Sequence, residues 1–116
     1  MNCPKHHTTL VPEETPRGTR FKCTEIGCTV ICWDGPTSTP ADATTRRARK
    51  EAHKAFDALW QGAGRGGRRR AYAWLRKALG IPEAKCHMGM FDETTCDKVI
   101  GLAYHAPSMR KKSGRW

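Results

Sequence analysis

Three segments in the second part of the chain place their apolar side chains at helical spacing. They span residues 44–61, 68–80 and 91–105, and Gly-rich or Pro-containing stretches separate them. Within each segment apolar residues recur three or four positions apart, while charged residues hold most other positions, which predicts three amphipathic helices. The side chains expected to be buried are Ala48, Ala52, Ala55, Phe56, Leu59 and Trp60 in the first helix, Ala71, Leu75, Ala78 and Leu79 in the second, and Cys96, Val99, Ile100 and Ala103 in the third.

The ends of the second and third predicted helices carry local signals. Gly80 suits the position just after a helix, where a left-handed backbone is common, and Pro82 prevents the helix from continuing. Asp92 is the expected N-cap of the third helix, because its carboxylate can accept hydrogen bonds from N–H groups of the first turn. Phe91 and Cys96 flank this cap at the spacing of a hydrophobic staple.

The beginning of the chain lacks helical spacing and is rich in cysteine, proline and threonine. Within residues 1–34, GTRFKC (18–23) and CTVICW (28–33) predict two β-strands that flank a tight turn. The next segment, residues 34–42, is dense in Gly, Pro, Ser and Thr, which predicts a linker.

Together these patterns predict an α+β protein, in which a small N-terminal ribbon of β-hairpins precedes a three-helix unit. We expect the ribbon and linker to occupy residues 1–38, a basic three-helix region to occupy 39–105, and a flexible basic tail to occupy 106–116. A chain of 116 residues has room for one compact domain or two very small modules.

Two pairs of metal-ligating residue types stand within the predicted ribbon. Cys3 and His6 lie three positions apart, Cys23 and Cys28 are separated by four residues, and sixteen residues lie between the pairs. Two tight pairs joined by a span of about fifteen to twenty residues are typical of a structural zinc site. Thiolates with one imidazole suit Zn²⁺, and four protein ligands leave no open coordination position. We therefore expect one structural zinc ion, which would make the ribbon a zinc ribbon.

The sequence also allows alternatives to this set of metal ligands. His7 is an alternative to His6, although the spacing from Cys3 favours His6. Cys32 lies in an apolar strand, which favours a place in the core. A second metal site on Cys86, His87 and Cys96 is less favoured, because helix packing and turn capping explain these residues more simply.

Composition limits the cellular setting. Only 38% of the residues are hydrophobic, and so small a core often needs the help of a metal ion. No apolar run is long enough to cross a bilayer, and no secretory signal opens the chain. We therefore expect a cytoplasmic protein without a membrane partner, whose six cysteines are metal ligands or buried thiols rather than disulfides.

Positive charge is concentrated in the helical region. The formal net charge is +10, and residues 1–38 carry four basic and four acidic side chains, whereas residues 39–79 carry eleven and three. Such an excess favours an anionic partner, and arginine pairs well with phosphate through its planar fork. Tyr72 and Trp74 would be able to stack on bases, although core packing also explains at least one of them. The residues expected to contact nucleic acid, with DNA favoured over RNA, are Arg46, Arg47, Arg49, Lys50, Arg65, Arg68, Arg69 and Arg70.

Three stretches carry a resemblance to a known family: AHKAFDALW (52–60), AYAWLRKALGIP (71–82) and CHMGMFDETTCDKVI (86–100). With the two knuckles before them, they resemble a phage and prophage family known as a zinc-finger-containing domain of unknown function. The resemblance implies a zinc ribbon followed by helices, in a phage protein inside a bacterial host cell. The chain departs from the family pattern at His6, where cysteine is usual, and in its C-x4-C second knuckle, where C-x2-C is usual. That longer knuckle also resembles the zinc ribbons at the C-terminal end of bacterial topoisomerases, which bind single-stranded DNA.

No catalytic constellation is evident in the sequence. Asp92, Glu93 and Asp97 lie at a predicted helix start, where capping and the helix dipole explain them. The loop GAGRGG lacks the lysine of a phosphate-binding loop. We therefore expect a non-enzymatic nucleic-acid-binding protein. The alternative is a protein-interaction module that inhibits or modulates a host enzyme.

Overall fold

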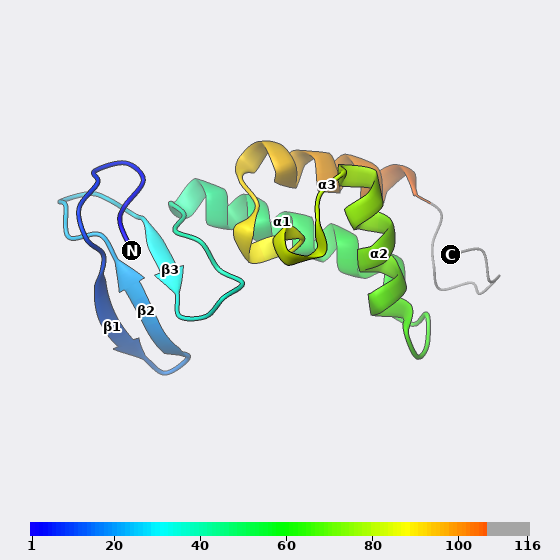
Figure 1. Cartoon of the computed structure of the whole chain (residues 1–116), viewed down its shortest axis with the longest axis horizontal. Coiled ribbons are helices and arrows are strands. Elements are labelled where there is room, and N and C mark those ends of the chain that lie inside the picture. Colours follow the sequence, from blue (N-terminus) through cyan, green and yellow to red (C-terminus); the bar gives the residue numbers. More distant parts are fainter. Residues whose placement is uncertain (107–116) are drawn as a thin grey trace.

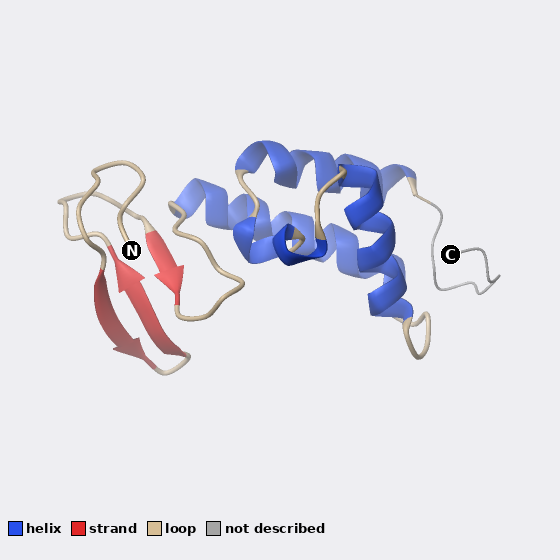
Figure 2. Cartoon of the chain, in the orientation of Figure 1, coloured by secondary structure: helices blue, strands red, loops and turns tan. Residues whose placement is uncertain are grey.

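A three-stranded sheet lies at one end of the protein and three helices lie at the other, as Figure 1 shows. The computed structural model describes residues 1–106, so the predicted tail from residue 107 onward lies outside the described residues. The strands are β1 (Val11–Thr15), β2 (Gly18–Lys22) and β3 (Ile31–Trp33). The helices are α1 (Ala43–Trp60), α2 (Gly67–Leu79) and α3 (Glu93–His105), with short 3-10 turns η1 (Glu83–Lys85) and η2 (Met88–Met90) between α2 and α3. The predicted α+β class is confirmed (Figure 2).

The sheet is an antiparallel meander with the strand order β1-β2-β3. The turn between β1 and β2 pairs Thr15 with Gly18, and Gly18 adopts φ 118, a backbone conformation that other residues rarely adopt. The sequence pattern indicated β2 and β3 but missed β1, because Pro12 weakens the strand signal. The sheet accommodates Pro12 because β1 is an edge strand, where proline is tolerated.

The two strands expected from the sequence are shorter than predicted at the loop that joins them. β2 ends at Lys22 and β3 begins at Ile31, so residues 23–30 form a loop. The Cys23 N–H donates to the Val30 carbonyl at 3.2 Å, and the Cys28 N–H donates to the Glu25 carbonyl at 3.0 Å. These bonds close the loop and bring Cys28 back toward Cys23.

The helices bury the apolar stripes that their spacing predicted, and α1 packs mainly against α3. Phe56, Leu75 and Val99 are fully buried at the centre of this core. Ala78 is an exception, because it borders a surface hollow between α2 and α3 and is exposed. Over residues 1–106, no helix combines the length and the apolar character that crossing a membrane requires.

Local caps fix where the helices begin and end. The Asp42 carboxylate accepts a hydrogen bond from the Thr45 N–H at 2.8 Å and caps α1. Asp92 caps α3 in the same way through the Thr95 N–H at 2.8 Å, as its position predicted. Gly80 ends α2 with φ 69, the left-handed conformation expected of it.

Residues 34–42, predicted as a linker, are hydrogen-bonded to both the sheet and the helical part. Ala41 and Ile31 exchange two backbone hydrogen bonds of 2.9 and 3.0 Å, which extend the sheet beyond β3. The Thr39 N–H donates to the carbonyl of Gly89, within η2, at 2.9 Å. The segment therefore joins the two parts by specific contacts as well as by the chain itself.

Gly89 makes the closest contact at this junction, and we expect Gly89→Ala to destabilise the protein. A Cβ atom at this position would lie 2.5 Å from the Thr37 carbonyl oxygen, so the backbone would have to move. The expected loss in the free energy of unfolding is about 2 kcal/mol, measured by urea denaturation.

Gly101→Ala is the matched control for this substitution. Gly101 lies in α3 with no atom within 4 Å of the Cβ that alanine would add. Alanine should therefore raise the free energy of unfolding by about 0.5–1 kcal/mol through helix propensity. Equal effects of the two substitutions would show that the contact between Gly89 and Thr37 does not form.

Candidate functional site

Four potential metal ligands converge at one end of the sheet. The ligand atoms of Cys3, His6, Cys23 and Cys28 all lie within 4.8 Å of one another. A turn closed by the hydrogen bond from the His7 N–H to the Cys3 carbonyl, 2.8 Å, carries the first pair, and the loop of residues 23–30 carries the second. The structure thus brings together the four residues selected from the sequence spacing. It holds no second cluster of this kind within residues 1–106.

The spacing of the donor atoms matches a tetrahedral metal site. The Sγ atoms of Cys3 and Cys28 are 3.8 Å apart, and Nδ1 of His6 lies 3.6 Å from the Sγ atoms of both Cys3 and Cys23. A tetrahedral Zn²⁺ ion with Zn–S bonds of about 2.3 Å and a Zn–N bond of about 2.0–2.1 Å places its sulfur atoms about 3.8 Å apart and sulfur about 3.5–3.6 Å from nitrogen. The donor set therefore fits zinc in chemistry, and these three distances match a tetrahedral site.

Hydrogen bonds favour the thiolate form of two of the cysteines. The Thr8 hydroxyl, 3.5 Å from the sulfur, lowers the pKa of Cys23 to about 6, and the Glu25 N–H acts in the same direction. Burial raises the pKa of Cys3, but hydrogen bonds from backbone N–H groups of its own turn outweigh this effect and lower it overall. Because cysteine binds metal ions as the thiolate, these bonds prepare the site for a cation.

The first ligand turn is also tied to the helical part. Lys5 lies between Cys3 and His6 and forms an ion pair of 2.8 Å with Asp42, the N-cap of α1. This ion pair, together with the hydrogen bond from the Thr45 N–H, holds the pKa of Asp42 well below its usual range. The turn that carries Cys3 and His6 is therefore tied to the start of α1.

The structure distinguishes His6 from His7 as the fourth ligand, and we expect their replacement to affect zinc retention differently. His7 is exposed, adopts φ 59 and is not among the four clustered residues. His6→Ala should strongly lower zinc retention through loss of a ligand, whereas His7→Ala should not. His6→Cys should retain zinc, because a thiolate can replace the imidazole. Elemental analysis of the purified variants tests this, and zinc loss confined to His7→Ala would assign the fourth ligand to His7.

The other three cysteines lie in the protein cores. Cys32 is buried in the sheet, with its sulfur 3.5 Å from the Ser38 carbonyl oxygen. Cys86 and Cys96 are buried among the helices, and burial raises the pKa of both thiols. All three side chains fill the cores, which is the role the pattern predicted for Cys32 and Cys96.

Arg46, one of the basic residues expected to contact nucleic acid, lies at the junction between sheet and helices. Its guanidinium donates to the backbone carbonyls of Thr29 and Ala41, the latter at 2.8 Å. The Ala43 N–H adds a bond to the Thr29 hydroxyl at 2.9 Å. The side chain therefore holds the first turn of α1 against the end of the sheet. This role could not be predicted from the sequence, because every residue has a backbone carbonyl and the acceptors therefore cannot be recognised by residue type.

Arg49 has a similar position, and we expect Arg49→Ala to destabilise the fold. Its Nε donates to the Phe91 carbonyl at 2.7 Å, and its other nitrogens donate to the carbonyl and hydroxyl oxygens of Thr39 at 3.0 and 2.8 Å. Removing the guanidinium leaves partly buried acceptors without their donors, which costs about 2–3 kcal/mol in the free energy of unfolding. Lys50→Ala, at the exposed neighbouring position, should change it by less than about 0.5 kcal/mol in the same urea titration. Equal stability of the two variants would contradict this role.

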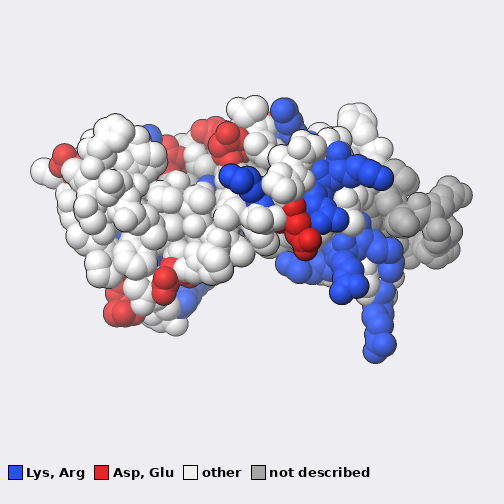
Figure 3. Space-filling model, viewed as in Figure 1, with Lys and Arg blue, Asp and Glu red and all other residues white. Residues whose placement is uncertain are grey.

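The basic residues around α2 occupy an open surface. Arg65, Arg68, Arg69 and Arg70 are exposed, as are Arg47 and Lys50 on α1. Figure 3 shows basic side chains gathered at the α2 end of the molecule, whereas the sheet end shows few. Within the described part of the chain, Arg65, Arg68 and Arg69 form no ion pair with an acidic side chain. We call the following residues the α2 basic surface: Arg65, Arg68, Arg69, Arg70, Arg76 and Lys77.

Comparison with protein families matches residues 17–106 to a zinc-finger-containing domain of unknown function. The chain belongs to this family. The matched range includes Cys23, Cys28 and all three helices, and it begins after Cys3 and His6. The resemblance to a family of zinc-finger-containing domains, inferred from the sequence, is thereby confirmed. No curated protein and no solved structure matches the chain.

Proposed function

We propose that this protein is a non-enzymatic, zinc-stabilised nucleic-acid-binding protein that uses the α2 basic surface and prefers DNA to RNA. The zinc ion would be held by Cys3, His6, Cys23 and Cys28. With four protein ligands the ion keeps no open position for a substrate or an activated water, so it serves the fold of the ribbon. The charge of the helical part would supply the binding.

The uneven distribution of charge carries this proposal. The ribbon is electrically neutral, whereas the α2 basic surface gathers exposed arginines, several of them without an acidic partner among residues 1–106. A merely solvated helix face would intersperse acidic residues among the basic ones. Arginine clusters of this kind attract the phosphate backbone and release its counterions on binding. We leave Arg46 and Arg49 out of the proposed surface because both are half-buried and backbone carbonyls engage their guanidinium groups. Arg70 also donates to backbone carbonyls, those of Arg65 and Ala63, but its side chain stays exposed.

The proposed metal site also supports a cellular setting for the protein. Cysteine ligands must stay reduced to hold zinc, which fits a reducing compartment. We therefore propose the cytoplasm of a bacterial host cell as its location and a phage as its origin, as the sequence resemblance implies.

Fluorescence anisotropy with labelled DNA tests the proposal directly. The full-length protein is titrated against a duplex DNA, a single-stranded DNA and an RNA of matched sequence, at about 50 mM and about 200 mM salt. We expect DNA binding that weakens steeply as salt rises, and weaker binding to the RNA. A zinc-loaded protein that binds none of the three at low salt would refute the proposal and favour a host protein as the partner.

A further inference from the structure

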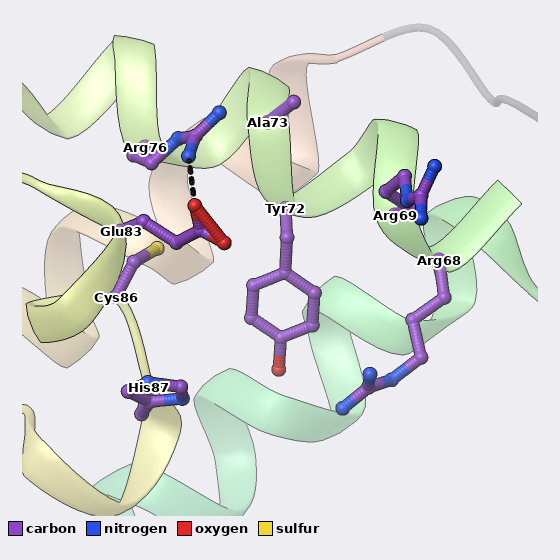
Figure 4. A pocket seen from close by; sticks show the side chains of 8 residues that line it. All are labelled: Arg68, Arg69, Tyr72, Ala73, Arg76, Glu83, Cys86 and His87. Atoms are coloured by element: carbon purple, nitrogen blue, oxygen red, sulfur yellow. Dashed lines mark hydrogen bonds and ion pairs between the residues drawn. The ribbon is translucent and has the colours of Figure 1, made fainter. Parts of the chain in front are cut away.

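A surface hollow of about 770 Å³ lies between α2 and the segment of residues 83–87 that follows it (Figure 4). It contains none of the four candidate metal ligands, and its volume is in the range of small-ligand sites. Arg68, Arg69, Tyr72 and Arg76 reach it from α2, and His87 reaches it from the residues between the two 3-10 turns. The hollow is thus formed by two chain segments that only the fold brings together.

The charged groups of the hollow leave two arginines for a ligand. Arg76 pairs with Glu83, also in the lining, at 3.2 Å. Arg68 and Arg69 form no ion pair with any acidic residue of the described chain. Both arginines line the hollow at the start of a helix, and each guanidinium can donate to phosphate oxygens of a bound strand. The hollow therefore favours an anionic ligand.

Tyr72 gives the hollow a fixed aromatic side. Its ring packs against Phe56 in a T-shaped arrangement with ring centres 4.7 Å apart, and the Arg68 guanidinium lies 4.9 Å from the Tyr72 ring centre. Burial raises the pKa of Tyr72, so its hydroxyl stays protonated at neutral pH and can donate a hydrogen bond. In Figure 4 this hydroxyl lies between the guanidinium of Arg68 and the ring of His87. The ring is therefore held in place by the core before any ligand arrives.

Apolar groups complete the lining. Ala73 and Cys86 are small residues of the hollow, beside Tyr72 and His87 respectively. A nucleobase needs such a surface for its faces and a few polar atoms for its edge, and Tyr72 and His87 supply both. The arginines at the start of α2 lie at the side where the attached phosphate would sit.

We propose that this hollow binds one unpaired nucleotide of a nucleic-acid strand, with the phosphate on Arg68 and Arg69 and the base between Tyr72 and His87. This inference rests on the proposed function and specifies the kind of strand that the surface prefers. In a paired duplex the bases are stacked inside the helix, so only phosphates would reach the surface. The protein should therefore bind single strands more tightly than fully paired duplexes.

Anisotropy titrations with the full-length protein test this preference. The probes are a labelled single-stranded DNA and a labelled blunt duplex of the same sequence, at one low salt concentration. The single strand should bind about tenfold more tightly, as expected for one stacked base. His87→Ala should remove most of this difference by weakening the single strand about tenfold while leaving the duplex nearly unchanged. Arg65→Ala, on the same surface but outside the hollow, should weaken both probes by the same factor.

A second measurement locates the ligand without relying on affinity for long strands. Titration of the protein with thymidine monophosphate should shift the NMR signals of Tyr72 and His87 more than those of residues outside the hollow. Equal affinity for single strand and duplex, or a His87→Ala variant that keeps the native difference, would overturn the proposed hollow and leave nucleic-acid binding intact. Failure of both probes to bind at low salt would instead overturn the proposed function.

Discussion

Replacing Cys23 by serine is expected to unfold the ribbon and to leave the helices folded. The buried core of the ribbon is very small and consists of Cys3, Leu10, Cys23, Val30 and Cys32. Two of these residues are proposed metal ligands, so without the ion little remains to hold the sheet together. A structural zinc ion contributes on the order of 10 kcal/mol to folding, which far exceeds what such a core supplies.

The effect can be followed through metal content and through the two parts of the structure. Elemental analysis should find one zinc ion per chain in the native protein and almost none in Cys23→Ser. NMR signals from β1 to β3 should collapse to unfolded positions, whereas the helical circular dichroism signal should largely persist because α1, α2 and α3 share their own core. Chelation of the native protein should give the same result.

Cys32→Ser is the matched control, since this cysteine lies in the same sheet. Its thiol points to the Ser38 carbonyl at 3.5 Å, and a serine hydroxyl can donate the same hydrogen bond. The variant should therefore retain one zinc ion per chain. Native protein purified from zinc-containing medium without any bound metal would rule out the zinc centre.

The parts of the structure that could be predicted from the sequence are those encoded by neighbouring residues. The spacing of Ala52, Phe56 and Leu59 gives a helical stripe, and Asp92 caps the helix that it precedes. The cluster of four ligand residues could also be predicted, because each ligand pair lies in one short turn and the number of residues between the pairs suits a hairpin. These signals involve only a few neighbouring residues, so they can be recognised without knowledge of the fold.

Contacts between distant segments could not be predicted in this way. Edge strand β1 is defined by its pairing with β2, and the linker-like composition of residues 34–42 gives no hint of the bonds that Thr39 makes to Gly89. Arg49 belongs to a basic run in the sequence, yet one of its acceptors is the carbonyl of Phe91, 42 residues further along the chain. The hollow beside α2 likewise depends on how residues 83–87 return to that helix. Charge counts alone cannot separate an arginine that holds the fold from one that faces solvent.

Replacing Arg65, Arg68 and Arg69 together by alanine is expected to cause the largest loss of nucleic-acid binding. All three are exposed, and none forms an ion pair with an acidic residue of the described chain, so their removal should not disturb the fold. Each lost phosphate contact should flatten the slope of log affinity against log salt by about 0.9 on duplex DNA. If each arginine makes one contact, the triple variant should flatten the slope by about 2.7 and weaken binding most at low salt.

Substitutions on the ribbon provide the matched control for this salt titration. Arg17→Ala combined with Lys22→Ala removes two exposed cations from the sheet end and should leave the slope nearly unchanged. Circular dichroism and zinc content confirm that each variant is folded before its affinity is compared. The opposite pattern, with a native slope for the α2 variant and a flattened one for the ribbon variant, would move the binding surface to the ribbon, where Cys23 and Cys28 lie. The expected pattern would place it on α2, where, within residues 1–106, exposed arginines gather without acidic partners to neutralise them.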